Sequence, residues 1–300
     1  MRIRPNRRSG PKNFPSQAFD VFNVAFMVFL AFVTFYPFYF IAVTSLSDGK
    51  AVMAGQVSLF PVKFTLASYG LVLRDPNILR SYLNTLLYTT LGTIINLGMT
   101  LLCAYPLSRP GLEGKKWIMG FIVFTMFFSG GMIPTFLVVN SLKMVNTIWA
   151  MVIPGALSTY NMIVTRSFFQ SLPEALHESA EIDGAGEMKI LTRIFLPLSM
   201  PIIATMTLFY AVGHWNSYMN ALLYLNDKKY YPIQSILRNM VVQGQMGSAT
   251  MDAGGGSDFL AIDTTIKYAV IMVATLPIML VYPFVQRYFV KGVMIGSIKG

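Results

Sequence analysis

The chain has 300 residues, of which 54% are apolar and 12% are charged, and its net charge is +10. Soluble domains contain about 25% charged residues, so this composition excludes an ordinary soluble fold, a disordered chain and a disulfide-rich scaffold. The single cysteine cannot form an internal disulfide. The basic residues lie between long uncharged runs and do not cluster on a soluble module, which favours a membrane protein over a nucleic-acid binder.

Six segments of at least 19 residues contain no Asp, Glu, Lys or Arg. A hydrocarbon core of roughly 30 Å needs about 20 apolar residues in a helix. The sequence therefore predicts an all-α membrane protein with six transmembrane helices within residues 21–290. We expect them at about 21–43, 83–105, 117–139, 146–165, 201–224 and 268–286. A buried core helix is the alternative for any one span, but not for six, and the first span is too long for a typical signal-peptide core.

The distribution of Lys and Arg predicts the orientation. With the N-terminus inside, the inside segments hold 14 basic residues and the outside segments hold nine. This bias places the basic tail 1–20 and the tail 291–300 in the cytoplasm. The alternative role of the tail 1–20 is attraction to anionic lipid.

The spans themselves indicate a passive pathway. Five contain proline, which suits bent helices, although membrane helices tolerate proline in any case. None contains Asp, Glu, Lys or Arg, which weighs against an ion-coupled carrier. Neutral polar and aromatic side chains suit sugar hydroxyls, and interhelical hydrogen bonding is the alternative for each of them. The candidates for the translocation pathway are Asn96, Ser129, Tyr160, Asn161, His214, Trp215, Asn216 and Asn220.

The motifs of common enzymes do not occur. No lysine is followed by Ser or Thr, so the phosphate-binding loop of an ATPase is missing. His177-Glu178 begins like a zinc motif, but Glu181 stands where the second histidine belongs. We therefore expect no catalytic residues, no metal site and no cofactor in this chain.

The loop 166–200 is the most informative stretch. Ser171 and Glu174 have capping-box spacing, which predicts a helix at about 173–182, and Asp183-Gly184 is expected to end it. A second short helix is expected to place Ile190, Leu191, Ile194 and Phe195 on one face and to stop at Leu196-Pro197.

Charge sets this loop apart. Glu174, Glu178 and Glu181 form one acidic stripe along the first helix. The loop has a net charge of −2, whereas the rest of the chain sums to +12. This predicts a docking surface for a basic partner, and an amphipathic linker lying on the bilayer is the alternative.

The loop resembles the E-A-A motif of ABC importer permeases. Glu178-Ser179-Ala180, Gly184, Ile194 and Leu196-Pro197 have its spacing, and the one departure is Ser179 for the middle alanine. The stretches 130–134, 146–155 and 291–300 are similar to the smaller permease of maltose-type carbohydrate importers, in the branch of lipoprotein, multiple-sugar and alginate permeases. The resemblance extends over nearly the whole chain.

The resemblance implies a type I ABC importer permease, the transmembrane subunit of an ATP-driven, binding-protein-dependent importer of sugars, in particular oligosaccharides. Such a subunit forms half of a pathway in the bacterial cytoplasmic (inner) membrane. The implied partners are a second permease, by family precedent a different chain, two ATPase subunits that bind ATP and Mg, and an extracytoplasmic solute-binding protein.

It also implies roles for residues. Glu178 would face a basic ATPase residue, Ala180 would allow close packing in the ATPase cleft, and Gly184 would allow the turn. The full coupling set is Glu174, Glu178, Ser179, Ala180, Asp183, Gly184, Ile194, Leu196 and Pro197. The tail 291–300 would reach between the ATPases. In the outside loop 226–267, Gly254, Gly255 and Gly256 would contact the binding protein, or form a flexible linker.

Two other hypotheses compete with an importer subunit. A stand-alone secondary carrier predicts buried charges or internal repeats, and neither is visible. A membrane scaffold without transport gives no reason for the E-A-A spacing.

Overall fold

The computed structural model describes residues 14–243 and 264–280, and every regular element within those ranges is a helix. The chain divides into two compact units. One comprises Met1–Tyr69 with Gly255–Met272, and the other comprises Gly70–Gly254 with Val273–Gly300. The predicted glycine contacts at 254–256 and the tail 291–300 lie outside the described residues.

The first unit is built on α1 (Phe14–Ser45), which contains the predicted span 21–43 and begins inside the predicted tail 1–20. Pro37 lies within this helix without breaking it. Almost every side chain from residue 19 to residue 38 is exposed, although the segment is strongly apolar. A helix with apolar side chains on every face needs lipid or protein around it.

Short helices follow α1 along the chain. α2 (Gly49–Met53) is capped by the carboxylate of Asp48, which accepts hydrogen bonds from two backbone N–H groups. α3 (Ala67–Arg74) begins next to two side-chain contacts. The hydroxyls of Ser45 and Tyr69 are 2.7 Å apart, and so are those of Ser68 and Thr265, the latter in the helix Thr264–Leu280.

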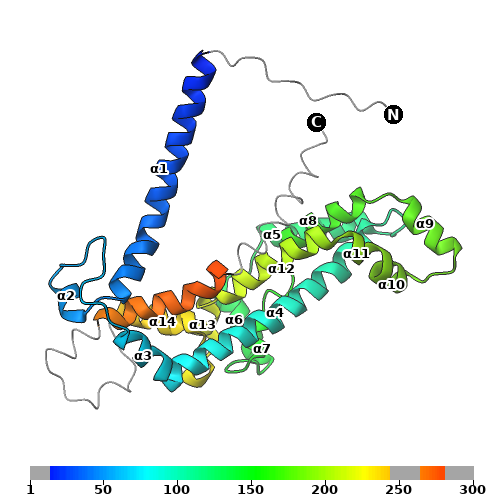
Figure 1. Cartoon of the computed structure of the whole chain (residues 1–300). Coiled ribbons are helices and arrows are strands. Elements are labelled where there is room, and N and C mark those ends of the chain that lie inside the picture. Colours follow the sequence, from blue (N-terminus) through cyan, green and yellow to red (C-terminus); the bar gives the residue numbers. More distant parts are fainter. Residues whose placement is uncertain (1–13, 244–263, 281–300) are drawn as a thin grey trace. The chain divides into compact units, whose positions relative to one another are not determined.

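The second unit is organised around α4 (Pro76–Ser108), which contains the predicted span 83–105. α8 (Thr159–Ser171) and α12 (Met200–Trp215) pack along it (Figure 1). Polar contacts join these helices, and one is the 2.6 Å hydrogen bond between the hydroxyls of Thr100 and Tyr210. Such contacts suit packing between membrane helices, where the hydrophobic effect supplies little attraction.

Three predicted spans are broken in the structure. The span 117–139 consists of α5 (Lys115–Phe127) and α6 (Met132–Ser141), which meet at 113°. Gly131 at the break has φ +83°, a conformation that glycine adopts readily. The prediction of one continuous helix was therefore wrong, and the break lies at residues 128–131 and not at Pro134, which lies in the first turn of α6.

The spans 146–165 and 201–224 are also discontinuous. The first contains α7 (Trp149–Val152), a turn with Gly155 at φ +77°, and then α8. The second contains α12, a break at 216–218 and α13 (Met219–Tyr224). In the sixth span, helix is described as far as Leu280, so residues 281–286 cannot be compared.

Segments predicted to share a side of the membrane lie at the same end of the second unit. The side chain of Asn84, near the start of α4, donates to the backbone oxygens of Lys229 and Tyr231. At the other end, the Arg166 side chain donates to the Leu107 oxygen at 2.8 Å.

The loop after α13 contains a turn, Lys228–Tyr230, and α14 (Ile233–Gln243), a helix that the sequence reasoning did not predict.

Two described helices, Phe19–Ser45 and Pro76–Ser108, are long and apolar enough to cross a membrane. The number rises to four if each bent helix pair is counted as one span. The structure therefore supports an all-helical membrane protein, while six spans with both termini inside stay a prediction.

Candidate functional site

The loop 166–200 folds as a helix–turn–helix, and its first helix begins later than the capping box predicted. α8 runs to Ser171, whose hydroxyl donates to the Phe168 oxygen within the same helix. α9 (Ala175–Ile182) follows, and Glu174 precedes it without a side-chain cap. The capping-box prediction was wrong because Ser171 belongs to the end of the preceding helix.

The turn after α9 confirms the predicted role of glycine. Gly184 has φ +76°, and its N–H donates to the Glu181 oxygen at 2.9 Å. The N–H of Ala185 donates to the Ala180 oxygen, also at 2.9 Å. Glycine closes the helix here because it adopts the left-handed conformation without a Cβ clash.

The second helix has three parts. α10 (Glu187–Ile190) continues through a π-helical turn, Leu191–Phe195, into α11 (Leu196–Leu198). Pro197 therefore lies within this segment, and the helical axis turns by 86° only beyond it, before α12. Ile190, Leu191 and Phe195 are buried, which confirms the predicted apolar face, and Ile194 is half-buried.

An aromatic cluster anchors this segment to α4. The rings of Tyr105, Phe169 and Phe195 meet edge to face, with centroids 5.3–6.2 Å apart. The guanidinium of Arg109 lies 4.4 Å from the centroid of the Phe195 ring. Aromatic and cation–π contacts of this kind stabilise a specific geometry as well as burying apolar area.

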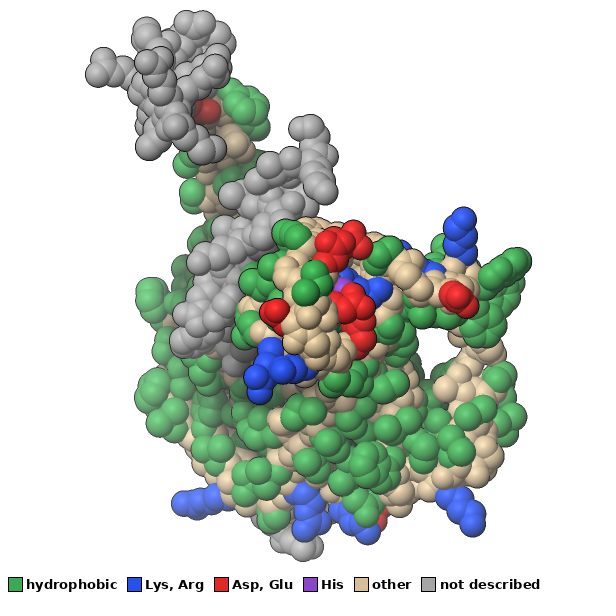
Figure 2. Space-filling view, turned by 90° about the vertical axis from the view of Figure 1, so that its right-hand side faces the viewer, with side chains coloured by type: hydrophobic (Ala, Val, Ile, Leu, Met, Phe, Trp, Pro, Cys, Tyr) green, Lys and Arg blue, Asp and Glu red, His purple; other side chains and the backbone are tan. Residues whose placement is uncertain are grey.

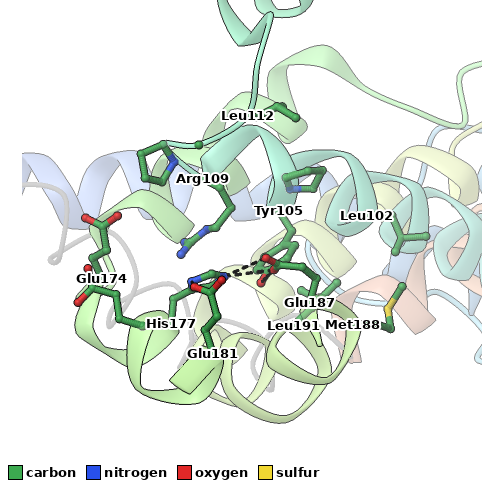
Figure 3. Close-up of a pocket in the computed structure, with 14 residues that line it drawn as sticks. Leu102, Tyr105, Arg109, Leu112, Glu174, His177, Glu181, Glu187, Met188 and Leu191 are labelled. Carbon is green, nitrogen blue, oxygen red and sulfur yellow. Dashed lines mark hydrogen bonds and ion pairs between the residues drawn. The ribbon is translucent and has the colours of Figure 1, made fainter. Parts of the chain in front are cut away.

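Beside the cluster is an open cavity of about 680 Å³ between the end of α4, α9 and α10 (Figure 3). Arg109 and His177 point into it from opposite walls. Its acidic lining comes from Glu174, Glu178, Glu181 and Glu187. Figure 2 shows acidic side chains gathered around a histidine on this face of the molecule. The sequence reasoning did not find Tyr105, Arg109 or the role of Glu187, since these residues are brought together only by the fold.

The predicted coupling residues divide between surface and interior. The side chains of Glu174, Glu178, Ser179, Asp183 and Pro197 are exposed, and those of Ile194 and Leu196 are half-buried. Ala180 is 7% exposed and packs in the core under α9. Its small side chain thus allows α9 to pack closely against its own chain.

The structure joins two of the predicted pathway residues. The Asn96 Oδ1 lies 3.3 Å from His214 Nε2, and the Asn96 amide donates to the Gly155 oxygen at 3.3 Å. Trp215 is buried, and its indole N–H donates to the Ala274 oxygen at 3.0 Å. The contact with His214 joins α4 to α12, and the contact with Ala274 joins α12 to the helix Thr264–Leu280, whereas Gly155 lies in the turn before α8.

The other predicted pathway residues lie apart from this node. Ser129 accepts from the N–H of Gly131 in the break of the third span. Tyr160 is exposed and Asn161 is buried in the first turn of α8. Asn216 follows α12 and Asn220 lies in α13, so His214 lies next to the last residue of α12.

Comparison with known proteins identifies the family. Residues 81–295 match the model of the binding-protein-dependent transport system inner membrane component. The chain belongs to this family. It is 42% identical to the polygalacturonan/rhamnogalacturonan transport system permease protein YtcP of Bacillus subtilis, over 95% of this chain and 99% of that protein. It is also 42% identical to protein LplC of the same organism, over 95% and 96% of the two chains.

A solved structure has the same fold. A chain of a bacterial ABC transporter involved in the import of the acidic polysaccharide alginate superposes with a TM-score of 0.87 and 32% identity, over 94% of this chain and 100% of that one. Membership of the transport family favours the importer subunit over the secondary carrier and the scaffold. The chain is a membrane permease component of an ABC importer.

Proposed function

We propose that this permease forms half of the translocation pathway of a saccharide importer and couples to ATPase subunits through α9. The observation that carries the coupling role is the acidic surface of α9. Glu178 and Glu181 on α9, and Glu174 directly before it, are exposed and line the cavity beside the end of α4. Opposite charge steers and orients a partner, so a basic ATPase cleft is the expected acceptor.

The proposed assembly contains four further subunits. The apolar side chains exposed on α1, α5 and α6 support burial in a bacterial cytoplasmic membrane and against a second, different permease. Two ATPase subunits supply ATP hydrolysis with bound Mg. The family description supports a solute-binding protein on the opposite side, where the predicted outside segments meet. Rigid-body rocking of the two permeases would then change the side to which the pathway opens.

The proposed cargo is an oligosaccharide, including uronate-containing ones. This rests on the substrates named for YtcP and for the alginate transporter, together with spans that carry no acidic or basic side chain. Calorimetry of the partner binding protein with oligogalacturonates and neutral oligosaccharides tests it. An amino acid or a metal as the tight ligand would refute the saccharide assignment.

Charge reversal tests the coupling surface. Glu178→Lys is expected to leave the permease in the membrane but to abolish co-purification of the ATPase subunits. Glu113→Lys is the matched control, because Glu113 is also exposed and lies in the other predicted cytoplasmic loop. Normal ATPase yield with Glu178→Lys would contradict the proposed docking surface.

A further inference from the structure

One carboxylate joins three separate segments at the base of the loop 166–200. The Tyr105 hydroxyl, on α4, donates to Glu187 Oε2 at 2.6 Å. His177 Nε2, on α9, lies 3.2 Å from both oxygens of Glu187, at the start of α10 (Figure 3). Contacts to an ionised carboxylate are among the stronger hydrogen bonds in proteins.

The donor is held rigidly. Tyr105 is 5% exposed, and its ring is packed by Phe169 and Phe195 with the Arg109 guanidinium 5.5 Å from its centroid. The hydroxyl therefore has a fixed direction, whereas the side chain of Glu187 is 64% exposed. The hydrogen bond from Tyr105 is the main reason that the pKa of Glu187 lies below its ordinary value, because this bond favours the charged carboxylate.

α9 has little else to hold it. Of its eight residues, Ala180 alone is buried, and the turn after it contains Gly184 and Gly186. The contact of His177 with Glu181 is long, at 3.9 Å, and lies within α9 itself. A helix with one buried alanine and a glycine-containing turn can pivot unless a polar contact fixes it.

We propose that Glu187 is a positioning residue of the coupling loop, binding α9 through His177 and α4 through Tyr105 so that the three segments move as one body. The inference rests on the proposed coupling function. It assigns transmission of the ATPase movement to one carboxylate, and leaves docking to the exposed glutamates of α9.

Two variants remove the contact with little loss of packing. Tyr105→Phe deletes only the hydroxyl, and Glu187→Ala deletes an exposed carboxylate. Tyr88→Phe is the matched control, because the Tyr88 hydroxyl also lies on α4 but donates to the Tyr230 oxygen at the other end of the helix. The double variant Tyr105→Phe/Glu187→Ala should behave like Glu187→Ala, since Glu187→Ala already removes the hydrogen bond that Tyr105→Phe deletes.

The measurement is amide hydrogen exchange in the purified complex of permeases and ATPases, without nucleotide and with ATP and vanadate. In Tyr105→Phe and Glu187→Ala we expect α9 amides to exchange about tenfold faster, as loss of one charged hydrogen bond predicts. In the wild type, ATP and vanadate are expected to change the amide exchange rates along α4. In the two variants we expect this change to be at least about threefold smaller, with ATPase co-purification unchanged. Tyr88→Phe should match the wild type.

Two results would overturn the inference. One is wild-type exchange in α9 and a wild-type response of α4 in both variants. The other is loss of ATPase co-purification, because Glu187 would then act in assembly. Failure of the proposed coupling function would give a different result. The wild-type permease would then bind no ATPase, or its α4 would not respond to ATP and vanadate, and the positioning role of Glu187 would fail as well.

Discussion

Replacing Gly92 with alanine places a methyl group inside the imidazole of His214, where α4 packs against α12. The added Cβ would lie 2.4 Å from both Cε1 and Nε2 of the ring and 2.7 Å from Cδ2. The ring must therefore move, and it then loses its 3.3 Å contact with Asn96. Gly98→Ala on the same helix meets no atom within 4 Å and is the matched control.

The net effect can be estimated from three contributions. Overpacking a filled site costs about 1–3 kcal/mol. Loss of a hydrogen bond between membrane helices costs about 0.6 kcal/mol. Alanine in place of glycine within a helix stabilises the helix by up to about 1 kcal/mol. With the full helix gain, Gly92→Ala should therefore be destabilised by about 0.6–2.6 kcal/mol, and should lie about 1.6–3.6 kcal/mol below Gly98→Ala.

The assay is thermal unfolding of the two variants in the same detergent, followed by intrinsic fluorescence. We expect Gly92→Ala to melt below the wild type and Gly98→Ala to melt at or above it. The double variant Gly92→Ala/His214→Ala should recover part of the loss, because the clash is gone. Equal melting temperatures for Gly92→Ala and Gly98→Ala would show that the ring is not packed on Gly92.

Three further predictions test local features. Gly184→Ala should destabilise the loop 166–200 by about 1–2 kcal/mol, because the φ of Gly184 is +76°. Gly186→Ala should not destabilise the loop, because Gly186 has an ordinary φ of −73°. Faster amide exchange in α9 for both variants would contradict this difference. Asn146→Ala should lower the melting temperature, since the Asn146 side chain accepts two backbone N–H bonds at 3.2 and 3.1 Å. Asn146 has φ +63°, which glycine adopts readily, so Asn146→Gly should lower the melting temperature less. The depressed pKa of Glu187 stabilises the fold above the pKa of glutamate in the unfolded chain, and this contribution is lost as pH falls through the lower folded-state value. The melting difference between wild type and Glu187→Gln should therefore shrink on acidification, and a difference that is constant with pH would refute the assignment.

Local rules predicted the features that depend on neighbouring residues. The long apolar helices α1 and α4 follow from uncharged runs, and the turn at Gly184 follows from the need for a left-handed residue. The apolar face of the segment 190–195 follows from its helical spacing. The E-A-A spacing indicated the family, which comparison of the chain with known proteins confirms.

Other local patterns were misleading because packing overrode them. Ser171 has the spacing of a capping residue, but α8 extends through it. The uncharged runs at 117–139 and 201–224 contain breaks that hydropathy cannot detect, since the residues at the breaks are themselves neutral. In the third span the bend lies at Gly131 and its neighbours, and not at the proline of that span.

The sequence by itself determined that this is a helical membrane protein with an acidic loop of E-A-A spacing, because uncharged runs, charge and motif spacing are all read along the chain. Tertiary structure alone decided which side chains meet. Tyr105 and His177, from two different segments, both contact the carboxylate of Glu187 in a third. Gly92 on α4 approaches His214 on α12. Such contacts depend on how helices that are far apart in the chain pack against one another. A local sequence pattern does not determine that packing.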